Sequence, residues 1–308
     1  MYHRFNETKY PSTNTQIPIF KEHIQMIKSS GFEFLNPKLL SEFFYIEKPE
    51  KKFLLTIDDG YSSFYKHAWP YLLENEVPFL IFISTEAVGK NGYMDWEQIK
   101  EIEKFDFVNI GNHSHSHDYL INFDFKDFEK DIEKSIKIFN QKLGYNPKFF
   151  SYPFGEWDLK QKKFISQNFE FAFGQHSGVI DLNKDRYELP RFPINEKYGD
   201  LERFKFLVNL LPFQYKKVEP EEKIIDNNNP PKMIVEFFQN QNIKNMNCFS
   251  NEGDGWDKSK LIIKNNILTV NFRDKFKNRR GRINCSINDN DGWRWFGVQF
   301  VQKNIKEN

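Results

Sequence analysis

Strand-like and helix-like segments alternate from residue 52 to residue 173, and this alternation constrains the fold more than any other feature. Short apolar runs typical of buried strands lie at 52–57, 77–84, 107–111, 149–152 and 169–173. Segments with apolar residues at helical spacing separate them, at 62–75, 96–103, 125–143 and 159–167. Repeated strand–helix units predict an α/β fold with a mainly parallel sheet, open or closed into a barrel. In such folds, functional side chains gather at the carboxyl ends of the strands.

Two groups of polar side chains follow these predicted strands. Asp58 and Asp59 come directly after the run at 52–57, and Gly60 permits a sharp turn there. The segment 111–117, Gly-Asn-His-Ser-His-Ser-His, follows the third run. Two carboxylates this close repel each other unless a positive group shares the site. The sequence therefore predicts a divalent metal held by two imidazoles and one carboxylate, with the other carboxylate free to act as a base.

The spacing of the histidines leaves two arrangements open. On a strand, His113, His115 and His117 would share one face, whereas on a helical turn only His113 and His117 would. Three imidazoles plus Asp59 would close the metal site and leave no position for water.

Charge and composition exclude some classes of function. A formal net charge of +1 gives no general argument for nucleic acid or an anionic membrane surface. The longest apolar stretch, 77–83, contains Pro78 and is too short to span a membrane. No signal peptide is visible, and Cys248 and Cys285 cannot form a disulfide framework, so we expect a cytoplasmic protein with reduced thiols. The oligomeric state is not indicated.

The pattern changes after the first domain, which we place at 1–214. Polar, proline-bearing segments predict a linker at 215–231, and short apolar runs with turn residues between them predict a β-sandwich domain at 232–308. Trp256 and Trp293 follow two related Asp-Gly turns of that domain. They either stack on sugar rings, which would make the domain carbohydrate-binding, or pack in its core or against the first domain.

Three segments in order resemble the first three motifs of the polysaccharide deacetylase (NodB-homology) family, carbohydrate esterase family four. They are Thr-Ile-Asp-Asp-Gly-Tyr at 56–61, the histidine segment at 111–117 and Ser-Tyr-Pro-Phe-Gly at 151–155. The resemblance covers roughly residues 1–210. It implies a distorted (β/α) barrel and a metal-dependent hydrolase that removes acetyl groups from sugars.

Carried over position by position, the resemblance implies that Asp59, His113 and His117 bind the metal and that Asp58 is the general base. It favours the arrangement in which His115 points outward. One divalent ion is expected. Zn²⁺ is the first expectation, and Fe, Co and Ni suit the same donor set.

The third motif implies residues that contact the substrate. Tyr152, Pro153 and Phe154 would line the acetyl pocket, and the backbone N–H of Phe154 would bind the oxyanion. Phenylalanine stands at this position where the family usually has tyrosine, which leaves a main-chain donor unaffected. Tyr61, at the end of the first motif, is a further candidate for contact with the substrate.

Two positions depart from the family pattern. The arginine that orients the base is absent near the third motif, and Arg191 resembles the later arginine of the branch that deacetylates biofilm poly-N-acetylglucosamine. That branch is circularly permuted, and Met1-Tyr2-His3-Arg4 resembles its displaced motif, which makes His3 the expected general acid. The strand before His3 is very short.

These expectations converge on hydrolysis of an N-acetyl group from an amino sugar or glycan, either a surface-polysaccharide precursor or a polymer. Two alternatives stay open. One is a related metal-dependent amidase acting on a small non-sugar amide. The other is a non-catalytic sugar-binding relative.

Overall fold

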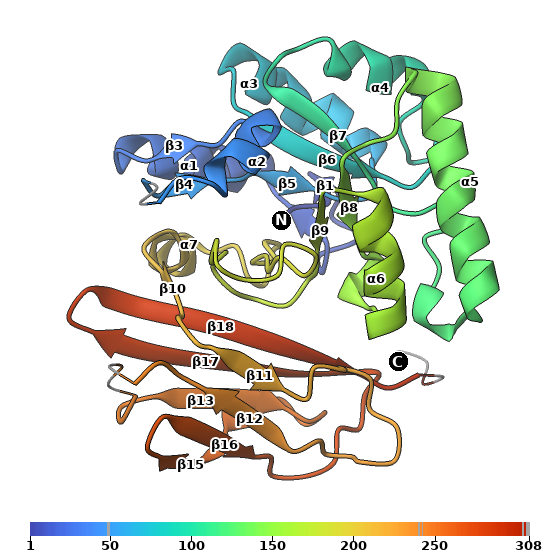
Figure 1. Ribbon diagram of the computed structural model, residues 1–308. Coiled ribbons are helices and arrows are strands. Elements are labelled where there is room, and N and C mark those ends of the chain that lie inside the picture. Colours follow the sequence, from blue (N-terminus) through green and yellow to red (C-terminus); the bar gives the residue numbers. More distant parts are fainter. Residues whose placement is uncertain (48–49, 240, 242, 304, 306–308) are drawn as a thin grey trace.

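The computed structural model describes residues 1–47, 50–239, 241, 243–303 and 305. An all-parallel five-stranded sheet, with its strands in chain order, forms a half-barrel in the first part of the chain (Figure 1). Its strands are β5 (Thr56–Ile57), β6 (Phe79–Ile83), β7 (Val108–Asn112), β8 (Phe149–Ser151) and β9 (Phe171–Phe173). The α/β fold and the parallel sheet are as predicted.

One helical segment connects each strand of this sheet to the next. These helices are α3 (Trp69–Glu74), α4 (Trp96–Glu103), α5 (Phe125–Leu143) and α6 (Leu159–Asn168). The bounds of α5 are those predicted, because Asp124 caps its first turn and Gly144, at φ 85°, ends it. Helix α3 begins later than predicted because a π-helical turn, Phe64–Ala68, precedes it.

Further elements complete the α/β part, which we define as residues 1–210. They are β1 (Arg4–Phe5), β2 (Asn14–Thr15), α1 (Ile17–Ser29), β3 (Glu33–Phe34), α2 (Leu40–Phe43), β4 (Lys52–Phe53), α7 (Leu201–Val208) and 3₁₀ turns at Pro37–Leu39, Leu120–Asn122 and Pro153–Gly155. The strand predicted at 52–57 is two short strands, because β4 pairs with β3 while β5 pairs with β6.

The rest of the chain, from β10 to β18, is called the β-region here and forms two sheets. One contains, in spatial order, β10 (Leu211–Pro212), β18 (Gly292–Val301), β17 (Arg280–Asp289), β13 (Asn247–Asn251) and β14 (Trp256–Lys258). The other contains β11 (Lys217–Glu219), β12 (Met233–Glu236), β16 (Ile267–Asn271) and β15 (Lys260–Lys264). Side chains from both sheets form one buried apolar cluster, which includes Met233, Val270, Ile283 and Phe300. Strands β17 and β18 lie next to the α/β part (Figure 1).

The predicted linker at 215–231 is wrong. Strand β11 lies within it and pairs with β12, and Ile225 is buried in the core of the β-region. The polar, proline-bearing composition concealed these positions because only alternate residues of an edge strand face the core.

The expectation of reduced thiols is also wrong. Cys248 on β13 and Cys285 on β17 face each other across the sheet and form a disulfide, with their Cα atoms 4.0 Å apart. Their pairing depends on strand register, which cysteine counting does not provide.

None of the helices in the described ranges combines the length and apolar character that a membrane crossing requires. Trp256 and Trp293 are 41% and 42% exposed. The Trp293 ring packs edge-on against Phe206 of α7, with ring centroids 5.8 Å apart, so this tryptophan contacts the α/β part.

Candidate metal centre and active site

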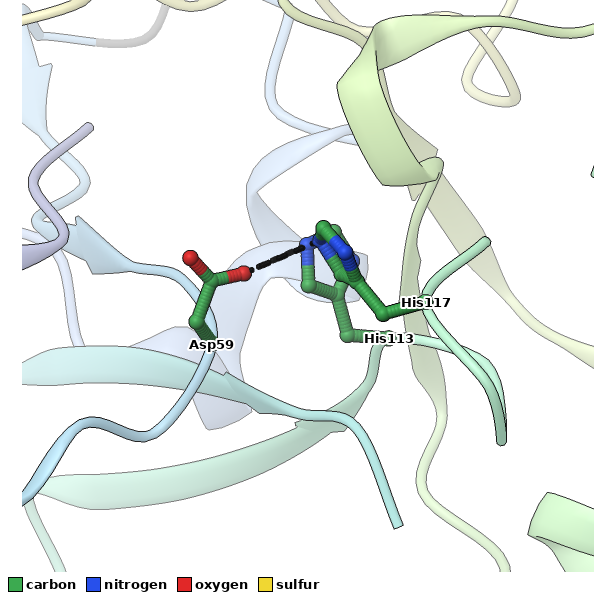
Figure 2. A group of neighbouring side chains, drawn as sticks. All are labelled: Asp59, His113 and His117. Atoms are coloured by element: carbon green, nitrogen blue, oxygen red, sulfur yellow. Dashed lines mark ion pairs between the residues drawn. The ribbon is translucent and has the colours of Figure 1, made fainter. Parts of the chain in front are cut away.

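Three side chains converge at the carboxyl ends of β5 and β7 (Figure 2). Asp59 follows the end of β5, His113 directly follows β7, and His117 lies four residues further on. The Oδ1 atom of Asp59 lies 3.3 Å from Nε2 of His113 and 3.1 Å from Nε2 of His117. One ligand atom from each residue lies within 4.8 Å of the other two. A single bound cation can bridge such a group.

The hydrogen bonds of the site suit a metal ligand set. Nδ1 of His113 lies 2.7 Å from the main-chain carbonyl of Ser151, so this nitrogen carries the proton and Nε2 keeps its lone pair. Nε2 of His113 and Oδ1 of Asp59 are buried, and neither has a hydrogen-bond partner among the described residues. Orphaned buried atoms are costly unless a cation satisfies them. One carboxylate and two imidazoles fit Zn²⁺ and leave coordination positions open for water and substrate.

Helix α5 holds the backbone of the histidine segment. The carboxylate of Asp131 accepts the backbone N–H of His115 at 2.8 Å and that of Ser116 at 3.0 Å. Asn112 donates to the hydroxyl of Ser135, one turn further along α5, at 2.8 Å. Asp131 and Ser135 are not among the residues predicted from the sequence. The signal for them was two polar residues four apart on the apolar stripe of a helix.

His115 and His176 lie outside the ligand group. His115 lies outside it and shares a hydrogen bond with Thr85 at 2.9 Å, so only His113 and His117 of this segment group with Asp59. His176 is packed beside Trp157, and burial lowers its pKa to about 3.

Asp58 is fully buried and forms a bidentate ion pair with Arg191. Nη1 and Nη2 of Arg191 donate to Oδ1 and Oδ2 of Asp58 at 2.7 and 2.8 Å. The guanidinium also donates to the carbonyl of Gly174 and the hydroxyl of Ser151. Burial alone would raise the pKa of Asp58, but the charge and hydrogen bond of Arg191, together with His113 and His3, outweigh burial and hold that pKa below its ordinary value. The structure thus brings Arg191 to the position that the resemblance implied.

The first residues of the chain carry His3 to the same site. The N–H of Tyr2 donates to the carbonyl of Thr56, and the N–H of Asp58 donates to the carbonyl of Tyr2, both at 2.9 Å. These bonds anchor a segment of only a few residues beside β5. Burial lowers the pKa of His3, while the nearby carboxylates of Asp59 and Asp58 oppose that shift.

Tyr61 lies at the edge of the site, and the Arg4 side chain packs on it. The guanidinium of Arg4 stacks on its ring, 3.5 Å from the ring centroid. Burial and the neighbouring Asp59 raise the pKa of its hydroxyl, so this group stays protonated. A protonated phenol here can donate a hydrogen bond.

The third motif forms a tight turn after β8. Phe154 has a left-handed backbone, with φ 58° and ψ 6°, and its ring stacks on Tyr119 with centroids 4.3 Å apart. The same ring lies 4.9 Å from the ring of His117. Pro153 is buried at the start of the turn, whereas Phe154 is half-buried.

The expectation that Tyr152 contacts substrate is not supported. Its side chain is 1% exposed, and its hydroxyl donates to the carbonyl of Tyr187 at 3.1 Å. The ring stacks on Trp157 in the core. Because side chains alternate at a strand end, Ser151 faces the Asp58–Arg191 pair and Tyr152 points the other way.

Unusual backbone conformations gather at this site. Of the seven non-glycine residues with positive φ in the described ranges, four lie here: Asp59, Ser114, His117 and Phe154. Such conformations persist only where surrounding contacts fix them, and they are typical of functional sites.

Residues 45–168 match the family model described as polysaccharide deacetylase. The peptidoglycan-N-acetylglucosamine deacetylase of Bacillus cereus is 32% identical over 117 residues, covering 37% of this chain and 41% of that protein. The poly-beta-1,6-N-acetyl-D-glucosamine N-deacetylase of Escherichia coli K12 is 22% identical over 209 residues, covering 53% and 31%. The chain spans between 31% and 64% of the length of the curated relatives it matches.

Solved structures share the fold. IcaB from Ammonifex degensii superposes with a TM-score of 0.59 at 23% identity, covering 67% of this chain and 94% of that one. A de-N-acetylase from Aggregatibacter actinomycetemcomitans gives 0.60 at 15% identity, covering 67% and 97%. The family match lies on the sheet that carries Asp58, Asp59, His113 and His117, and these residues form the geometry described above. Residues 45–168 of this chain therefore match the polysaccharide deacetylase family.

Proposed function

We propose that this protein is a metal-dependent hydrolase that removes the N-acetyl group from an amino sugar of a glycan. The observation that carries the proposal is the pairing of two features at one sheet edge. Asp59, His113 and His117 present converging ligand atoms, and the ionised Asp58 lies beside them without belonging to that group. A cation site next to a separate buried carboxylate is what hydrolysis by an activated water requires.

Asp59, His113 and His117 would hold the metal, and Zn²⁺ is the ion we propose. When bound, such an ion polarises the acetyl carbonyl and lowers the pKa of a bound water. The hydrogen bond from His113 to the Ser151 carbonyl fixes one ligand ring, and the contact of the Phe154 ring limits the movement of the other.

The other residues of the site handle protons and charge. Asp58, oriented by Arg191, accepts the proton of the attacking water. The backbone N–H of Phe154 donates to the oxyanion that forms on the acetyl carbonyl. His3 donates a proton to the leaving amine, which breaks the amide bond and releases acetate. The hydroxyl of Tyr61 would hydrogen-bond the sugar.

The names of the relatives narrow the substrate class. The Escherichia coli and Bacillus cereus proteins are both named as deacetylases of N-acetylglucosamine in a polymer. We therefore propose β-linked N-acetylglucosamine residues as the substrate.

We further propose that the β-region is an accessory β-sandwich. The two sheets of the β-region enclose a buried core of their own, which supports this. The cytoplasmic location stays a prediction. The disulfide between Cys248 and Cys285 argues against it, because disulfides persist mainly in oxidising compartments. Fractionation of the source cells would decide between the cytoplasm and an oxidising compartment.

The test compares two histidines of one segment. Metal-free wild type, His117→Ala and His115→Ala are titrated with zinc and assayed for acetate release from β-1,6- and β-1,4-linked N-acetylglucosamine oligomers. Wild type and His115→Ala should bind one zinc and release acetate, whereas His117→Ala should bind zinc at least ~100-fold more weakly.

Asp58→Asn separates binding from chemistry. It should keep zinc and lose about 10²- to 10⁴-fold in turnover. A wild type that binds no zinc would overturn the metal mechanism. Zinc binding without acetate release from either oligomer would favour the two alternatives, an amidase acting on a small non-sugar amide or a non-catalytic sugar-binding relative.

A further inference from the structure

Strand β18 of the β-region holds the turn that carries Phe154. The side-chain amide of Gln299 donates to the carbonyl of Phe154 at 3.1 Å and to that of Gly155 at 3.0 Å. Gln299 is 4% exposed. Its amide oxygen accepts from Nε of Arg282 at 2.9 Å, and this bond orients the NH₂ group toward the turn. The main chain of β18 also lies close to the main chain of the α/β part at Ser177, since a Cβ on Gly297 would lie 2.5 Å from the carbonyl oxygen of Ser177.

A buried ion pair joins the two parts of the chain next to this turn. Arg279, just before β17, is 1% exposed and binds the carboxylate of Glu156 with Nε at 2.8 Å and Nη2 at 2.6 Å. The same guanidinium lies over the ring of Tyr119, 3.9 Å from its centroid. That ring in turn stacks on Phe154. The β-region therefore contacts the backbone carbonyl of Phe154 itself, the Tyr119 ring that stacks on it, and Glu156, two residues later.

These contacts match what the turn needs. A bulky residue with a positive φ is strained and persists only when its surroundings fix it. Removing one partner of a buried ion pair leaves an uncompensated charge, so the Arg279–Glu156 pair resists separation of the two parts. The predicted oxyanion donor is the N–H of this same strained residue.

We propose that Gln299 and Arg279 are positioning residues of the active site, through which the β-region fixes the conformation of the Phe154 turn. The β-region is then part of the catalytic apparatus and not an independent carbohydrate-binding module. The inference rests on the proposed deacetylase activity for its kinetic consequence. Its structural consequence, an ordered turn, does not depend on that activity.

Gln302 provides a matched control. It is the same residue type three positions along the chain, and its amide likewise donates to two carbonyls, of Phe276 at 3.0 Å and Asn278 at 2.7 Å. Both acceptors lie within the β-region. Gln299→Met and Gln302→Met thus remove equivalent bonds, but only the first frees the Phe154 turn.

The experiment measures kcat, KM and zinc affinity for both variants, together with hydrogen–deuterium exchange of the peptide around residues 150–157. Gln299→Met should lose about 10- to 100-fold in kcat, since loss of one oxyanion donor costs about 10²- to 10³-fold. Its KM and zinc affinity should stay within about three-fold of wild type. Exchange at the turn should rise. Gln302→Met should keep wild-type kcat and exchange at the turn.

Arg279→Lys serves as a second variant if Gln299→Met does not fold. It keeps the buried charge and loses the bidentate geometry, so about ten-fold in kcat should be lost, with faster exchange at the turn. Equal kcat and exchange in the two glutamine variants would overturn the proposal. If wild type releases no acetate, the proposed function fails. Exchange alone then decides: unchanged exchange in Gln299→Met refutes the positioning role and increased exchange supports it.

Discussion

Replacing Asp131 by alanine should weaken metal binding although this residue touches no ligand atom. Its carboxylate accepts two backbone N–H groups of the histidine segment, from His115 at 2.8 Å and from Ser116 at 3.0 Å. His117 is the next residue. The variant removes both acceptors from a position that is 8% exposed.

The magnitude follows from these two bonds. A hydrogen bond to a charged group contributes about 1.5 to 3 kcal/mol. Both donors belong to half-buried residues, so water replaces part of the loss and about 2 to 3 kcal/mol remains for the pair. Zinc binding must then reorder the segment at that cost. The expected weakening is about 30- to 150-fold in Kd.

Calorimetric titration of zinc into the metal-free protein measures this effect. Asp131→Asn keeps one oxygen acceptor and should fall between alanine and wild type. Glu133→Ala removes an exposed carboxylate from the same helix and should bind zinc like wild type. Wild-type zinc affinity in a folded Asp131→Ala protein would refute the view that α5 positions the histidine segment.

Two further predictions concern stability. His23 is fully buried, and burial lowers its pKa from 6.5 to about 4. Because the unfolded chain then binds the proton more tightly than the folded chain, protonation favours unfolding. The free energy of unfolding should therefore keep its full value above pH 6.5 and fall by up to about 3 kcal/mol as the pH drops toward 4. Denaturant unfolding at pH 7 and pH 5 should show this loss in wild type and less of it in His23→Gln, and equal pH slopes would contradict it. The disulfide between Cys248 and Cys285 closes a loop with a sequence separation of 37 residues, so reduction should lower the free energy of unfolding by about 4 kcal/mol. Thiol titration of the denatured, unreduced protein should find no free thiol, and two free thiols would contradict the observed pairing.

Local spacing allowed much of the candidate site to be predicted. Asp58 and Asp59 are neighbours in the chain, and His113 and His117 lie four residues apart on one turn, so their proximity needs no knowledge of the whole fold. The helix at 125–143 was predictable for the same reason, because its apolar period and its glycine stop are local signals.

Contacts between distant segments were beyond such signals. The resemblance suggested Arg191, but its bidentate contact with Asp58 spans 133 residues and depends on the path of the chain after β9. Tyr152 was misassigned because the direction of a side chain at a strand end depends on register, which motif spacing does not contain. Strand β11 could not be predicted for a related reason. Its sequence is polar, and its strand conformation depends on pairing with β12.

The sequence by itself thus determined the α/β class, the adjacent carboxylates of Asp58 and Asp59 and the His113–His117 pair, because each of these depends on residues close together in the chain. Tertiary structure alone decided what surrounds them. The hold of α5 on the histidine segment, the anchoring of His3 beside β5 and the contact of Gln299 with the Phe154 turn all join segments far apart in sequence. Packing fixes such contacts, and the local periodicity of the chain carries no record of them.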